Sequence, residues 1–269
     1  MFLNKLLVAV DDSEPSQYAI DVGIIIAQRD KCPILFALVL DPALTPQNYG
    51  FDSICELAEA KANQILQSAM QKARAAGVEC SSKTIYHDAS QGIIDLANAE
   101  NVGVIVMGTH GRTGMARAVL SSIAETVLRR TKTPLCVIRR PPIGIIHGRF
   151  LVPIVADDLG KAAVNYAIEL ARSFESTLLF CTVTDGSNKQ TATALLEEAK
   201  RIALEGGVQA EGILLEGRAS DAILQQSGIQ QTDAIVMASH ARDGFMRFVK
   251  GSVTETVMRS SLIPVVVIR

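Results

Sequence analysis

The sequence predicts an α/β protein of two similar domains, each a five-stranded, mainly parallel sheet with helices on both faces. Residues 104–139 and 234–269 align without a gap, and 17 of the 36 aligned positions are identical. Continuous apolar runs alternate with helix-like segments, a pattern typical of buried parallel strands joined by crossover helices. Pro141 and Pro142 fit neither a central strand nor a helix, so we predict domains at 1–140 and 149–269.

The first half is expected to alternate between strand and helix throughout. Four apolar strands and a more polar one are predicted at 6–10, 33–40, 80–86, 102–107 and 134–138. Helices are predicted at 15–29, 53–76, 91–100 and 122–132. Pro134 and Pro264 open the last strand of each half, a position that tolerates proline.

The start of the first half also has a counterpart in the second. When Val8 is placed on Val152, the segment "LLVAVDD" aligns with "FLVPIVADD". The first half then carries a longer connection, residues 41–53, where the second has residues 185–190.

Composition excludes several classes of function. The chain of 269 residues is 48% hydrophobic and 20% charged with a net charge of -2, so no basic surface favours nucleic acid or an anionic membrane. No apolar run approaches the roughly 20 residues that span a bilayer. The N-terminus reaches acidic residues too early for a signal peptide, so we expect a cytoplasmic protein. Five cysteines without CxxC spacing indicate buried thiols rather than disulfides or a metal site.

Glycines mark a candidate anion site. Gly108, Gly111 and Gly114 follow an apolar strand and precede a helix, where a glycine loop can turn several N–H groups toward a phosphate. Ser122 and Glu125 have the spacing of a capping box, as do Ser252 and Glu255, so we expect both helices to start at these serines. The alternative for Gly108 and Gly111 is plain turn chemistry.

These residues resemble the nucleotide-binding pattern of the universal stress protein family. The resemblance rests on "VAVDDSE" near the start and on Gly108, Gly111 and Ser121-Ser122, and it covers essentially the whole chain twice. It implies an adenine-nucleotide α-hydrolase-like, Rossmann-like fold, with ATP bound by some members. The family has a glycine where this chain has Ser121.

In the first half, the resemblance implies an ATP site, with any Mg²⁺ carried mainly by the phosphates. Its residues would be Ala9, Val10, Asp11, Val39, Met107, Gly108, His110, Gly111, Arg112, Ser121, Ser122 and Ile123. Alternatives remain open. Asp11 can belong to a turn before a helix capped by Ser13, Val39 and Met107 can be core, and the loop side chains can be solvated. In the second half Val155, Ala238 and Ala241 replace Asp11 and two glycines, so weak binding or none is expected there. The alternative is that Asp157 or Asp158 substitutes for the missing acid and that Lys250 attracts phosphate.

Three functions are consistent with this pattern. The first is a nucleotide-binding stress-response or signalling protein. The second is a nucleotide-free scaffold that acts by dimerisation. The third is a slow ATP hydrolase or a protein that phosphorylates itself, although no catalytic residues are assigned and the P-loop lysine is missing. The two final strands are expected to pair within one chain as a pseudo-dimer, while homodimerisation and the protein partner stay open.

Overall fold

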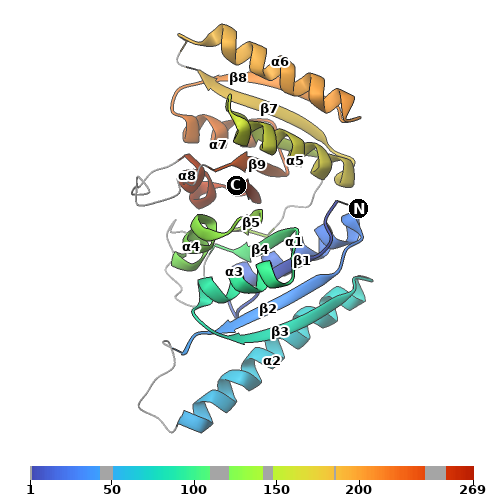
Figure 1. Cartoon of the computed structure of the whole chain (residues 1–269), viewed down its shortest axis with the longest axis vertical. Helices are drawn as coiled ribbons and strands as arrows, with labels where there is room; N and C mark the ends of the chain where they lie inside the picture. The colour runs from blue at the N-terminus through green and yellow to red at the C-terminus, as the bar shows by residue number, and fades with distance from the viewer. Residues whose placement is uncertain (1, 43–50, 110–120, 142–147, 185, 240–252) are drawn as a thin grey trace. The chain divides into compact units, whose positions relative to one another are not determined.

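The chain divides into two compact units, residues 3–141 (domain 1) and 142–269 (domain 2). The computed structural model describes residues 2–42, 51–109, 121–141, 148–184, 186–239 and 253–269. Within the described residues, each domain contains five strands and the helices that connect them (Figure 1).

Domain 1 alternates between strand and helix as the sequence predicts. Its strands are β1 (Leu6–Ala9), β2 (Ile34–Leu40), β3 (Cys80–Tyr86), β4 (Val104–Gly108) and β5 (Leu135–Ile138). Its helices are α1 (Glu14–Asp30), α2 (Phe51–Ala75), α3 (Ala89–Ala99) and α4 (Ser122–Arg130).

The five strands described in domain 1 lie in the order β3-β2-β1-β4-β5, and each of them runs parallel to its neighbours within the domain. The chain runs outward from β1 through β2 to β3 and then returns to the other side of β1. The strand order therefore reverses between β1 and β4, the place where open parallel sheets bind ligands beyond their carboxyl ends. Ala9 is level with Met107 across this boundary.

The helices cover the sheet in two pairs. An ion pair between Lys72 and Asp21 joins α2 to α1, whereas α3 packs against α4. Gly23 lets α1 approach β1 closely, because a Cβ at this position would come within 2.7 Å of a Val8 methyl carbon. A parallel sheet covered in this way keeps both faces dry, which explains its continuous apolar strands.

Domain 2 repeats this arrangement. Its strands are β6 (Arg149–Pro153), β7 (Thr177–Thr184), β8 (Ala210–Glu216), β9 (Ala234–Ala238) and β10 (Val265–Ile268). Its helices are α5 (Asp158–Phe174), α6 (Lys189–Glu205), α7 (Ala219–Ile229) and α8 (Val253–Ser260). The order β8-β7-β6-β9-β10 matches β3-β2-β1-β4-β5, so the sequence repeat is also a structural repeat.

The prediction of buried thiols is confirmed for three cysteines, Cys32, Cys136 and Cys181. Cys80 is partly exposed. Burial raises the pKa of the Cys136 thiol to about 12 and raises that of Cys181 as well. None of the helices in the described part of the chain is both long and apolar enough to cross a membrane.

We predict that alkylation of the native protein spares Cys136 and Cys181. The thiolate is the reactive form, and a raised pKa together with burial keeps these two groups protonated and covered. After iodoacetamide treatment at pH 8, peptide mass spectrometry should find Cys80 modified and the two buried thiols unmodified until urea is added. Native labelling of either buried thiol at the rate of Cys80 would contradict the packing described above.

A cluster of charges fastens the amino-terminal edge of the domain 1 sheet. Glu100, which ends α3, pairs with Lys5 ahead of β1 at 2.7 Å and with Lys83 on β3 at 2.5 Å. Hydrogen bonds from these two ammonium groups lower the pKa of Glu100 to about 2.

The Glu100 carboxyl should therefore titrate near pH 2 in the folded protein. Because its pKa is lower folded than unfolded, its contribution to stability is complete above about pH 4.3 and is lost as the pH falls through about 2. Carbon-detected NMR of the carboxyl group measures this titration directly. In Lys83→Met the titration should move upward, and an unchanged midpoint would show that the cluster does not act on Glu100.

Candidate functional site

The candidate site lies at the carboxyl ends of three neighbouring strands of domain 1. Val39 is near the end of β2, Asp11 follows β1, and Gly108 ends β4. Because β1 lies between β2 and β4, Asp11 stands between the apolar residue and the glycine. Adjacent strands are about 4.8 Å apart, so the three positions span about 10 Å.

Asp11 belongs to a hydrogen-bonded turn that leads into α1. Its Oδ1 atom accepts from the Ser13 N–H at 2.9 Å and from the Ser13 hydroxyl. Its own N–H donates to the Ser16 Oγ at 2.9 Å. Ser13 is the N-cap of α1, as in the alternative considered from the sequence, and its Oγ accepts from the Ser16 N–H at 3.3 Å. Asp12 pairs with Lys61 of α2. The turn is thus built largely from side-chain bonds, and Asp11 stays partly exposed.

Gly108 is required by packing against α1. A Cβ built on Gly108 would come within 2.8 Å of the carbonyl carbon and of the Cβ of Pro15, and within 3.0 Å of its carbonyl oxygen. Gly108 is not among the glycines with positive φ, so no left-handed turn is involved. Plain turn chemistry, the alternative considered from the sequence, is therefore wrong for Gly108. The absent side chain lets α1 begin directly against the end of β4.

The two residues that flank the glycine loop, Thr109 and Ser121, are joined by a hydrogen bond. Thr109 continues β4 and donates its N–H to the Ile138 carbonyl at 2.9 Å. The Ser121 N–H donates to the Thr109 carbonyl at 2.7 Å, so the first residue after the loop returns to the end of β4. His110, Gly111 and Arg112 lie outside the described residues, and their predicted roles remain predictions.

Helix α4 is capped by Ser121, which corrects the prediction of a cap at Ser122. The Ser121 backbone is extended, and its Oγ accepts from the Ala124 N–H at 3.1 Å. The bond from Ser121 to Thr109 holds it in the cap position, so Ser122 becomes the first helical residue. Glu125 bonds to Arg129 one turn later instead of closing a capping box. Ser252 lies outside the described residues, and α8 begins at Val253.

The cap at Ser121 leaves two N–H groups at the start of α4. The N–H of Ala124 bonds to the cap side chain, and the N–H of Glu125 makes the first helical bond, to the Ser121 carbonyl at 3.0 Å. The N–H groups of Ser122 and Ile123 precede that bond. Groups in these positions carry the positive end of the helix dipole and bind anions.

The apolar site candidates are largely parts of the core. Met107 is only 6% exposed, and Val10 is buried and donates its N–H to the Ala37 carbonyl at 2.8 Å. Ala9 and Val39 are half-buried. Val39 also lies under α3, since a Cβ on Gly92 would come within 3.3 Å of its Cγ1. Val39 thus keeps some surface at the strand end, whereas Met107 keeps little.

The equivalent turn of domain 2 is closed by its main chain. Val155 stands in the place of Asp11 and is 48% exposed, and the Asp157 N–H donates to the Val155 carbonyl at 3.0 Å. Gly160 stands in the place of Ser16. A Cβ there would lie 2.0 Å from the Val155 oxygen, so only glycine permits this turn.

The nearby acids of domain 2 have other roles. Asp157 caps α5 and accepts from the Gly160 N–H at 2.7 Å. Asp158 is fully exposed on the helix and pairs with Lys161 at 3.3 Å. Neither takes the place of Asp11. Ala238 ends β9 where Gly108 ends β4, and Ala241 lies outside the described residues.

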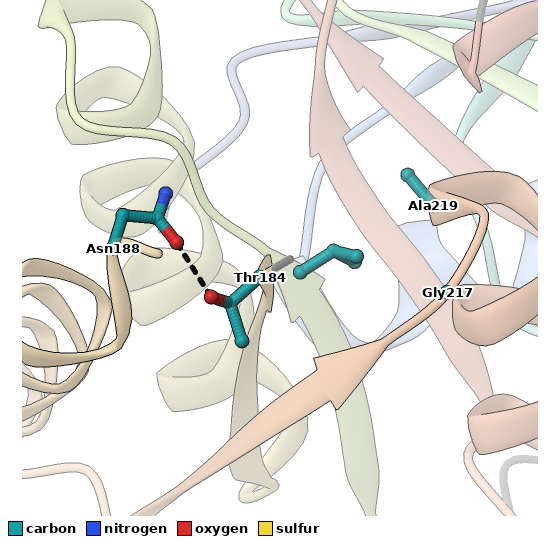
Figure 2. Close-up of a pocket in the computed structure, with 5 residues that line it drawn as sticks. Thr184, Asn188, Gly217 and Ala219 are labelled. Atoms are coloured by element: carbon teal, nitrogen blue, oxygen red, sulfur yellow. Dashed lines mark hydrogen bonds between the residues drawn. The ribbon is translucent and has the colours of Figure 1, made fainter. Parts of the chain in front are cut away.

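A pocket of about 400 Å³ opens at the carboxyl ends of β7 and β8 in domain 2. Figure 2 shows Thr184 and Asn188 pointing toward one another across a hydrogen bond, with Gly217 and Ala219 on the opposite wall. Val183, which also lines the pocket, is the counterpart of Val39. The pocket is therefore one strand further out than the counterparts of Asp11 and Gly108.

Two residues that shape the candidate site are not among those predicted from the sequence. Pro15 determines the need for Gly108, and Ser16 holds the backbone of Asp11. The spacing Asp-x-Ser-x-x-Ser was a usable signal, because a side chain two residues before an N-cap often bonds back to it. Within the described residues, no three His, Cys, Asp or Glu side chains gather as metal ligands.

We predict that Gly108→Ala destabilises domain 1 by about 1–3 kcal/mol, because the added methyl overpacks the contact with Pro15. The matched control is Ala238→Gly in domain 2, which should cost only about 0.5–1 kcal/mol through backbone entropy. Urea unfolding followed by circular dichroism compares the two. If Gly108→Ala is as stable as the wild type, the start of α1 can move to make room for the methyl group without a loss in the free energy of unfolding.

Comparisons with known proteins agree with this architecture. The model of the universal stress protein family matches residues 3–139 and 147–269. Universal stress protein MJ0531 of Methanocaldococcus jannaschii is 26% identical over 140 residues, which cover 51% of this chain and 82% of that protein. Universal stress protein YxiE of Bacillus subtilis is 28% identical over 149 residues, covering 51% and 99%.

A solved structure extends the likeness to both domains. The crystal structure of a universal stress protein from Archaeoglobus fulgidus has the same fold over 99% of this chain and 96% of its own, with a TM-score of 0.83 and 24% sequence identity. The two matches of the family model together cover nearly the whole sequence. The chain therefore belongs to the universal stress protein family and carries two domains of that family in tandem.

Proposed function

We propose that the protein binds an adenine nucleotide, ATP, mainly in domain 1, and acts as a stress-response or signalling protein of the cytoplasm. The observation that carries the proposal is the order in which an apolar residue, a carboxylate and a helix start follow one another along the edge of the sheet. Val39, Asp11 and the Gly108–α4 region follow one another across β2, β1 and β4. This order matches the base, ribose and phosphates of a nucleotide.

The polar groups along this edge suit a nucleotide. A carboxylate at Asp11 accepts hydrogen bonds from ribose hydroxyls, while half-buried Val39 offers an apolar surface to the base. At the other end, the N–H groups of Ser122 and Ile123 suit the phosphates. Gly111, His110 and Arg112 are expected to add donors from the loop, and Mg²⁺ is expected to be carried by the phosphate oxygens.

Domain 2 provides a natural comparison for the proposal. Val155 offers no acceptor in the place of Asp11, and the turn around it is shaped by Gly160 rather than by a carboxylate. Ala238 replaces Gly108 at the end of β9. We therefore propose one principal nucleotide site per chain.

Titration calorimetry with ATP should report one site per chain. Asp11→Asn keeps the shape of the side chain but replaces one carboxylate oxygen by an amide donor, so the affinity should fall about tenfold or more. ATP at about 100 times its dissociation constant should stabilise the wild-type domain by about 2.7 kcal/mol and raise Tm by several degrees. Val155→Asn is the matched control and should leave the affinity unchanged.

Two equivalent sites, or a loss of binding in Val155→Asn but not in Asp11→Asn, would overturn the assignment to domain 1. Absence of any binding would favour the nucleotide-free scaffold of the same family. Release of phosphate from bound ATP would favour the slow hydrolase. Pairing of the two final strands and homodimerisation stay predictions of the sequence.

A further inference from the structure

We propose that Ser13 and Ser16 are positioning residues that aim Asp11 at the ribose, and that they set the preference of domain 1 for a ribonucleotide. The inference rests on the proposed function, because it assigns the selectivity of that same site. Neither serine is among the residues expected to touch the nucleotide.

Ser13 fixes the side chain of Asp11. Its N–H and its hydroxyl both bond to Oδ1, so one carboxylate oxygen is held by two donors. Within the part of the chain that the structure describes, the hydrogen bonds to this carboxylate go to Oδ1. Oδ2 is therefore the oxygen that serves a ligand. The Ser13 hydroxyl donates to Asp11 and also accepts from the Ser16 N–H. The same group therefore caps the helix and orients the carboxylate.

Ser16 fixes the backbone of Asp11. Its side chain is buried, with the residue 2% exposed, and its Oγ accepts from the Asp11 N–H at 2.9 Å. Main chain and side chain of Asp11 are thus held from the same first turn of α1. Fixing both removes rotamer and backbone freedom before a ligand arrives, which lowers the entropic cost of binding.

Domain 2 has a different residue at each of the three positions of this hydrogen-bonded arrangement. Val155, Asp157 and Gly160 replace Asp11, Ser13 and Ser16. Asp157 still caps its helix, so capping by itself does not require a serine at this position. What serine adds in domain 1 is a hydroxyl donor, and a donor is of use only where an acceptor, Asp11, is to be aimed.

The test therefore separates capping from aiming. Ser13→Asp keeps a good cap, as Asp157 does in domain 2, but removes the hydroxyl donor and places a second carboxylate beside Asp11. Ser13→Thr keeps both cap and donor. Asp157→Ser is the matched control in domain 2. Calorimetry on each full-length variant measures the dissociation constants of ATP, 2′-deoxy-ATP and 3′-deoxy-ATP, and thermal unfolding without nucleotide reports the cap.

The wild type should prefer ATP to at least one deoxy analogue by about tenfold or more, since that analogue leaves a charged acceptor unpaired. In Ser13→Asp this preference should fall to about twofold or less, with Tm little changed. Ser13→Thr and Asp157→Ser should keep the wild-type preference, and Ser16→Ala should reduce it.

The failures can be told apart. A wild type that binds no ATP refutes the proposed function itself. A wild type that binds ATP without preference over either analogue refutes the aim at the ribose. Full selectivity in both Ser13→Asp and Ser16→Ala refutes the positioning role while leaving the nucleotide site intact.

Discussion

The candidate site of domain 1 depends on one close contact, in which the start of α1 packs directly against the end of β4. Pro15 takes the space where a side chain on Gly108 would lie, so the helix begins as near to the sheet as the backbone allows. At the start of this helix, Ser13 and Ser16 form hydrogen bonds with Asp11 and so hold the turn that follows β1. At the same strand end, the Ser121 N–H donates to the Thr109 carbonyl, and this bond holds the start of α4 there. Gly108 thus allows the start of α1 to lie against the strand end, and Thr109 beside it holds the start of α4.

The two domains solve one structural problem in different ways. Each must turn from its first strand into a helix that covers the sheet, and both do so in the same strand order. Domain 1 closes the turn with side chains, and domain 2 closes it with the Val155 carbonyl. The residue at the first turn of the helix decides between them, because the space filled by the Ser16 side chain is where that carbonyl lies in the other copy. The turn at Asp11 in domain 1 and the turn at Val155 in domain 2 therefore differ in backbone geometry and not only in their side chains.

Most of the fold could be predicted from the sequence, since apolar periodicity and the repeat report the sheet directly. Every helix of domain 1 begins and ends within two residues of its expected bounds, and the polar edge strand at 80–86 was found. The local details were harder. Two adjacent serines fit the cap of α4 equally well by spacing, and a tertiary bond to Thr109 selects the first of them. Pro15 and Gly108 are 93 residues apart, so no pattern along the chain reveals why the glycine is needed.

The main-chain turn of domain 2 has a consequence for how the two copies diverge. The geometry of a turn closed by a main-chain carbonyl does not depend on the side chain of the residue that supplies it. Substitutions at Val155 therefore preserve the turn as long as Gly160 is kept. In domain 1 the corresponding turn is held by side-chain hydrogen bonds. A change at Asp11, Ser13 or Ser16 therefore alters the shape of the turn as well as its chemistry. Sequence divergence is therefore less restricted at this turn in domain 2 than at the corresponding turn in domain 1.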